Sequence, residues 1–162
     1  MKKAIVLLTA SFLISATNIF AQATYKEEVD AAQAIFGKAK KELVAELIKL
    51  TPDEAAKFWP VYDAYEAERK VLGQQRLELI MDVAEAYDNM TAEKADAITS
   101  KTMKLSTQND KLLASYYKKV KKATNSNIAF EFYQEELYLL TEIRAELMSE
   151  IPLYSEIKPV KK

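Results

Sequence analysis

The chain has 162 residues, of which 49% are hydrophobic and 29% charged, and its formal net charge is −1. This length and composition are typical of one folded domain. The sequence contains no cysteine and no histidine, which excludes disulfides, thiol nucleophiles, imidazole bases and the usual transition-metal ligands. Only 2 glycines and 4 prolines occur, and alternating β-branched runs are absent, so the sequence predicts an all-α fold.

Residues 1–21 have the pattern of a secretory signal peptide. Lys2 and Lys3 precede an apolar run over residues 4–14, which is too short to span a bilayer. Cleavage after Ala21, or as late as Ala23, leaves a small residue at the cut. We therefore expect a soluble periplasmic protein with no membrane insertion. Without Lys2 and Lys3, 21 of the 23 basic residues remain against 24 acidic ones, a net charge of −3 that argues against a nucleic-acid partner.

The first helical pattern after this segment covers residues 26–49. Gly37 is its weakest position, because glycine disfavours helix interiors. Its expected apolar stripe comprises Val29, Phe36, Leu43, Leu47 and Leu50.

A second helix is expected to begin after Thr51. Thr51 supplies a capping hydroxyl, Pro52 fits the first helical position, and Glu54 completes a capping box. The helix is expected to run to about Tyr87, with a kink or a restart at Pro60 because an internal proline removes a hydrogen-bond donor. Its apolar face comprises Phe58, Trp59, Tyr62, Tyr65, Leu72, Leu79, Ile80 and Val83.

A turn over residues 88–90 leads to a third helix, which Thr91 is expected to cap and which ends near Lys122. So short a connection makes the second and third helices antiparallel neighbours. The apolar seam of the third helix comprises Ile98, Leu105, Leu112, Tyr116 and Val120.

Residues 123–126 break the pattern and offer capping side chains to a fourth helix that ends near Glu150. Its expected apolar stripe comprises Phe130, Tyr133, Leu137, Leu140, Ile143 and Leu147, flanked by Phe132 and Leu139. Residues 155–162 are polar and are expected to form a flexible tail. The helical domain is thus expected over residues 24–154.

Helices of this length do not fit a compact sphere. A compact domain of about 140 residues has a radius of gyration of about 14 Å, whereas a helix of about 36 residues is roughly 54 Å long. We therefore expect either bent helices or an elongated four-helix antiparallel arrangement around a long central hairpin, with one face uncovered. An uncovered apolar face would bind a second copy, which gives a homodimer, or another protein.

The second helix carries the candidate protein-binding surface, which comprises Phe58, Tyr62, Tyr65, Arg69, Leu72 and Arg76. Two interpretations are open. In the first, the aromatic side chains are core, and the arginines reach the edge or pair with a glutamate from a neighbouring helix. In the second, cations and aromatic rings form an amphiphilic surface for adaptable binding.

No residue pattern indicates catalysis. The pairs Glu135 with Glu136 and Glu66 with Glu68 lie among alternating charges, which favours solvated helix surfaces. There is no nucleophile paired with a base, no glycine-rich phosphate loop and no calcium loop. We therefore expect no enzyme activity, no catalytic residue, and no bound metal or cofactor.

Two helix starts resemble the twin LTxxQ motifs of the Spy/CpxP family of periplasmic helical proteins. They are Leu50-Thr51-Pro52-Asp53-Glu54 and Met90-Thr91-Ala92-Glu93-Lys94. The final glutamine of the motif is Glu54 in one copy and Lys94 in the other, and the second leucine is Met90. Residues 58–65 and 132–153 are also similar to small exported helical proteins assigned near that family.

This resemblance covers most of the mature chain, and the motifs are themselves helix caps. It implies a cradle-shaped α-helical dimer that shields unfolded proteins without ATP or senses envelope stress. Some relatives bind metals through histidines, which this chain lacks.

Two functional hypotheses follow. One is an exported, ATP-independent chaperone-like or envelope-stress protein that binds unfolded or partner proteins through an amphiphilic helical surface. The other is a non-catalytic structural or adaptor protein that docks one specific envelope partner.

Overall fold

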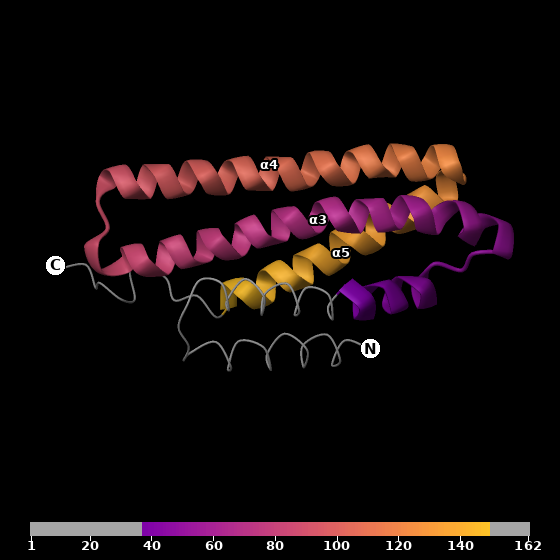
Figure 1. The fold of residues 1–162 in the computed structure, drawn as a ribbon, viewed down its shortest axis with the longest axis horizontal. Coiled ribbons are helices and arrows are strands. Elements are labelled where there is room, and N and C mark those ends of the chain that lie inside the picture. The colour runs from indigo at the N-terminus through magenta and orange to yellow at the C-terminus, as the bar shows by residue number, and fades with distance from the viewer. Residues whose placement is uncertain (1–36, 150–162) are drawn as a thin grey trace. The chain divides into compact units, whose positions relative to one another are not determined.

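A computed structural model describes residues 37–149, apart from the side chain of Leu147. These residues are helical nearly throughout and include no strand, so the all-α class is confirmed for this part of the chain. The predicted signal peptide over 1–21 and the predicted tail over 155–162 lie outside the described residues. The helices (Figure 1) are residues 37–47, α3 (Pro52–Ala86), α4 (Ala92–Ala123) and α5 (Ser126–Ser149), with a short 3-10 turn, η2 (Tyr87–Asn89), between α3 and α4.

The chain divides into two compact units, and the helical domain expected over residues 24–154 stays a prediction. Among the described residues, unit 1 contains 37–49 and 135–149, and unit 2 contains 50–134. Helix α5 therefore begins in unit 2 and ends in unit 1.

The N-terminus of α3 is fixed by the capping box that the sequence predicted. The Thr51 backbone N–H donates to the Glu54 carboxylate at 2.9 Å, and the Glu54 backbone N–H donates to the Thr51 hydroxyl at 3.4 Å. These bonds satisfy donors that a helix start otherwise leaves unpaired. Hydrogen bonds from the Thr51 backbone and then from its hydroxyl lower the pKa of Glu54, because they favour the charged carboxylate.

Pro60 does not interrupt α3, which runs as one helix of 35 residues. The expected restart at Pro60 is therefore wrong. The ring leaves the carbonyl of Ala56 without its helical donor. Both Ala56 and Pro60 are exposed, so water can hydrate the carbonyl that the proline leaves without a donor.

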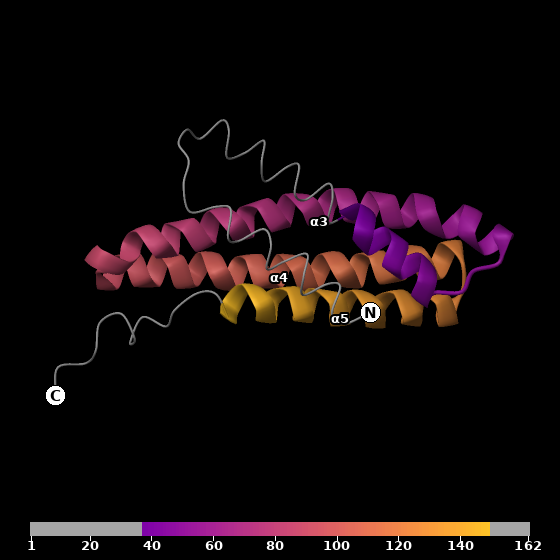
Figure 2. The same cartoon turned by 90° about the horizontal axis from the view of Figure 1, so that it is seen from below.

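Helices α3 and α4 form an antiparallel hairpin, as predicted (Figures 1 and 2). Lys101 on α4 contacts Asp82 on α3 at 2.8 Å, whereas further along α4 Tyr116 donates to Glu68 of α3 at 2.6 Å. Residue numbers thus rise along one helix as they fall along the other. Thr91 caps α4 as predicted, since its hydroxyl accepts a hydrogen bond from the Lys94 backbone at 3.2 Å.

The buried face of α4 differs from the predicted seam at one leucine. Leu113 is buried and Leu112 is only half-buried. Leu113 shares a face with Tyr116 and Val120, at spacings of three and seven residues, and these two are also buried. A seven-residue step from Leu105 to Leu112 therefore does not follow the buried face, whereas the same step from Leu113 to Val120 does.

Helix α5 begins where the sequence predicted a break. The Asn125 side-chain oxygen accepts hydrogen bonds from the backbone of Asn127 at 2.9 Å and of Ile128 at 3.0 Å, which is N-cap geometry. The predicted apolar stripe of this helix is wrong, because Phe130, Tyr133 and Leu137 are exposed. The two flanking residues of the prediction, Phe132 and Leu139, are buried instead, together with Ile128, Ala129 and Glu136.

In unit 1, residues 37–47 also bury a face other than the predicted one. Lys40, Val44 and Ile48 are buried, at spacings of four, whereas Leu47 is exposed and Leu43 is half-buried. The predicted stripe contained apolar residues only, whereas the buried face includes Lys40. The prediction of this face is therefore wrong. The stripe members Val29 and Phe36 lie outside the described residues.

No helix in the described part of the chain combines the length and the apolar character needed to cross a bilayer.

Candidate protein-binding surface

The aromatic residues of the predicted surface on α3 lie in the core of unit 2. Phe58, Tyr62 and Tyr65 are buried, and the ring of Phe132 from α5 lies 6.2, 6.3 and 5.3 Å from their respective centroids. All three contacts place the edge of one ring near the face of the other, a favoured aromatic geometry. These four residues are called the buried aromatic cluster below. The prediction that the three α3 rings form an exposed surface is wrong, and their interpretation as core is confirmed.

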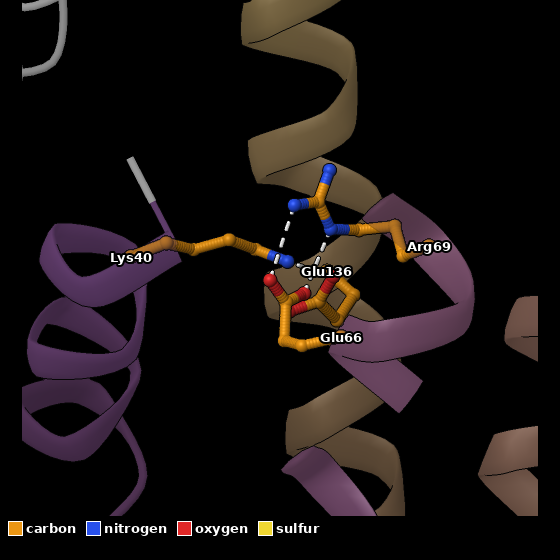
Figure 3. A network of polar contacts seen from close by, with 4 residues as sticks. All are labelled: Lys40, Glu66, Arg69 and Glu136. Carbon is orange, nitrogen blue, oxygen red and sulfur yellow. Dashed lines mark hydrogen bonds and ion pairs between the residues drawn. The ribbon is translucent and has the colours of Figure 1, made fainter. Parts of the chain in front are cut away.

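Arg69 is also buried, and it forms an ion pair with Glu66 on the same helix. Its guanidinium donates two hydrogen bonds to the Glu66 carboxylate, at 2.8 and 3.1 Å (Figure 3). This two-point contact lowers the cost of removing the arginine from water. The sequence predicted that the arginines reach the edge or pair with a glutamate from a neighbouring helix, and the glutamate of this ion pair lies three residues before Arg69 on α3 itself. The remaining predicted surface residues, Leu72 and Arg76, are half-buried.

Tyr116 joins α4 to the same region of α3. Its ring lies 5.4 Å from that of Tyr65, its hydroxyl donates to Glu68 at 2.6 Å, and the Lys119 ammonium lies 3.7 Å from its ring centroid. Burial, followed by the hydrogen bond to Glu68, raises the pKa of Tyr116. A phenol with a raised pKa is neutral at physiological pH, so this group holds two helices together and offers no base or nucleophile.

Unit 1 contains a buried ion pair that the sequence did not reveal. The Lys40 ammonium lies 2.6 Å from Glu136 Oε2, and both side chains are 1% exposed (Figure 3). The interpretation of Glu136 as one of a solvated pair of acids is therefore wrong. A buried charge requires a partner, and Lys40 is four residues before the buried Val44, a spacing that places the ammonium on the interior face.

The exposed rings of unit 2 lie on α5, and a half-buried ring of α4 contacts one of them. Phe130 is 59% exposed and Tyr133 is 38% exposed. They are three residues apart on one helix, so their side chains are neighbours. The ring of Tyr117 from α4 contacts that of Tyr133 edge-on, with centroids 5.9 Å apart. Tyr117, Phe130 and Tyr133 are called the aromatic patch below.

The sequence named Phe130 and Tyr133 as apolar residues but assigned them to the core. Both faces of α5 are rich in large apolar residues, so helical periodicity alone does not identify the outward face. The structure identifies the inward face, because Phe132 is the ring of α5 that contacts all three rings of α3. Leu137, one turn beyond Tyr133 on α5, is exposed as well.

The described residues contain no group of three or more acids that could hold a metal ion. Their closest acid contacts are the ion pairs and hydrogen bonds given above, which leave Glu66 and Glu136 engaged with cations.

Comparison with protein-family models, with curated proteins and with solved structures found no match. The resemblance to the Spy/CpxP family thus stays a prediction from the two helix starts.

Proposed function

We propose that this chain is a non-enzymatic binding protein of the cell envelope, which holds unfolded or partner proteins without ATP. The observation that carries the proposal is the aromatic patch of Tyr117, Phe130 and Tyr133 on the surface of unit 2. The signal-peptide pattern over residues 1–21 is the reason for placing the activity in the envelope.

The composition of the patch suits protein binding. Phenylalanine and tyrosine are enriched at protein interfaces, since they present large rigid surfaces at a low cost in side-chain entropy. Tyrosine adds a hydroxyl that can hydrogen-bond to many different backbones. Such a surface accepts varied apolar sequences and does not require one fixed shape.

The patch replaces the α3 surface that the sequence predicted. The rings of Phe58, Tyr62 and Tyr65 are needed for the core, and exposing them would forfeit their contacts with Phe132. Client binding is therefore assigned to α4 and α5, where the rings are accessible without unfolding.

The test is suppression of aggregation by the purified mature protein, mixed with an unfolded client at equimolar ratio. The variant Phe130→Ser with Tyr133→Ser removes the two exposed rings of the aromatic patch, and we expect it to weaken client binding about tenfold, as for loss of an interface hot spot. The matched control is Val71→Ser with Met81→Ser, which removes two exposed apolar side chains from α3. No suppression by the parent protein, or equal loss in both variants, would contradict the proposal.

Two further measurements define the mode of binding. Capture from envelope extracts should recover many unrelated proteins. Recovery of a single protein would instead indicate an adaptor that docks one partner. Sedimentation of the mature protein tests the proposed homodimer, and the Phe130→Ser with Tyr133→Ser variant shows whether the aromatic patch is its interface.

A further inference from the structure

Positive charge is concentrated in one part of this nearly neutral chain. Residues 111–130 contain five lysines and no acidic residue, although the whole chain has a net charge of −1. Four of the lysines, called the lysine cluster below, lie within the last two turns of α4: Lys118, Lys119, Lys121 and Lys122. All four are exposed.

The contacts of unit 2 leave this charge largely uncompensated. Within the described residues, no ammonium of the lysine cluster forms an ion pair, and Lys119 lies over the ring of Tyr116. Two acids at this end of the hairpin have other partners. Glu68 accepts from Tyr116, and Glu54 bonds to Thr51 and, at 3.4 Å, to Asn125. Cations in the last turn of α4 favour the helix dipole, but that effect involves only Lys121 and Lys122.

An apolar ring lies on the same corner of the molecule. Phe130 follows the turn between α4 and α5 by one helical turn and is 59% exposed. Lysines that accompany exposed aromatic rings are typical of segments that lie at a membrane surface, where cations meet anionic headgroups and rings enter the interfacial layer.

We propose that the lysine cluster docks unit 2 onto an anionic phospholipid surface, with Phe130 entering the headgroup layer. The charges spread over about half of the circumference of α4, since successive residues are 100° apart. Mobile lipid headgroups can move to neutralise lysines that are spread in this way around a helix. A folded acidic partner would require carboxylates fixed at matching positions. The docking is peripheral and does not depend on client binding.

Cosedimentation of the mature protein with vesicles tests this inference. We expect binding to vesicles of phosphatidylcholine mixed equally with phosphatidylglycerol, little binding to phosphatidylcholine alone, and release at high salt. Replacing the whole cluster by glutamine (K118Q, K119Q, K121Q, K122Q) should lower the partition coefficient about 100-fold or more, because each lysine near an anionic surface contributes about fivefold.

A matched control changes the same charge on the same helix. The variant K94Q, K101Q, K104Q, K111Q removes four exposed lysines from the rest of α4, and it should retain most of the binding. Circular dichroism of both variants verifies that α4 is intact. Equal binding to neutral and anionic vesicles, or equal loss in the two variants, would overturn the inference.

The alternative ligand of the lysine cluster is an acidic polypeptide. Binding to soluble polyglutamate distinguishes this ligand from an anionic lipid surface. Binding to polyglutamate as tight as to anionic vesicles would overturn lipid docking. Phe130→Ser should weaken vesicle binding and leave any residual polyglutamate binding unchanged. The vesicle assay contains no client and the client assay contains no lipid, so each proposal can fail while the other stands.

Discussion

Unit 2 uses the same kinds of aromatic residue in two opposite ways. The buried aromatic cluster packs three rings of α3 against Phe132, whereas the aromatic patch leaves Phe130 and Tyr133 of the same helix in contact with solvent. Phe130 and Phe132 are two residues apart, about 200° around α5. The comparison shows that the partner across the interface decides which ring is buried, since residue type is identical at the two positions.

This difference separates stability from binding along one helix. A ring in the cluster contributes transfer free energy and close packing to folding. A ring in the patch contributes little to folding and is available to a ligand. The two roles can therefore be changed independently.

The largest effect is expected from a direct comparison of the two phenylalanines. Phe132→Ala should lower the free energy of unfolding by about 3–5 kcal/mol, because it removes a buried ring that contacts three others. Phe130→Ala should change it by about 0.5 kcal/mol or less, as for an exposed position. Denaturant unfolding followed by circular dichroism measures both, and similar losses would show that the two faces of α5 are misassigned.

A second prediction concerns the buried charge on the inward face of α5. Glu136→Ala removes the carboxylate that lies 2.6 Å from the buried Lys40 ammonium, and the expected loss is about 3–5 kcal/mol. The double variant Lys40→Met with Glu136→Leu should be close to neutral or more stable than the parent, because both charges are removed together. The exposed Glu131→Ala is the control. If the double variant is as unstable as Glu136→Ala, the ion pair itself stabilises unit 1, and the loss in Glu136→Ala does not come from removing only one of its members.

The smallest effect concerns the start of the helix that carries most of the buried cluster. Thr51→Ala should cost about 1 kcal/mol at neutral pH, and Thr91→Ala should cost less, since Thr91 has no glutamate three residues on to complete a box. Thermal unfolding of both variants measures the difference. An equal cost at the two caps would show that the Glu54 carboxylate adds nothing.

The capping box also predicts how the stability of the folded protein changes with pH. The pKa of Glu54 is lowered in the folded protein, so its contribution to stability is complete above the ordinary glutamate pKa. That contribution is lost as the pH falls through the folded value, because the proton removes the charge that the Thr51 donors favour. The stability gap between the parent and Glu54→Ala should accordingly narrow on acidification.

Local signals in the sequence predicted the ends of the helices well. Thr51, Thr91 and the break before Ser126 are short-range capping patterns, and the short η2 connection implied an antiparallel hairpin. Each of these depends on residues close together in the chain, so the sequence contains the required information.

The faces of two helices were not predictable in the same way. Residues 37–47 and α5 both have two plausible apolar stripes, and the choice depends on contacts with distant segments. Lys40 and Glu136 looked like surface residues until their mutual contact was known. The candidate site was not predicted, because the sequence places Phe130 and Tyr133 on the stripe expected to be core, and only contacts with distant segments show otherwise.

Trp59 is the only tryptophan of the sequence, and its ring contacts Phe58 at 5.0 Å and Tyr62 at 5.5 Å. The molecule thus has a built-in fluorophore against its most densely packed rings. Its emission should therefore follow melting of that packing. Loss of the aromatic core can thus be measured optically in the unlabelled protein.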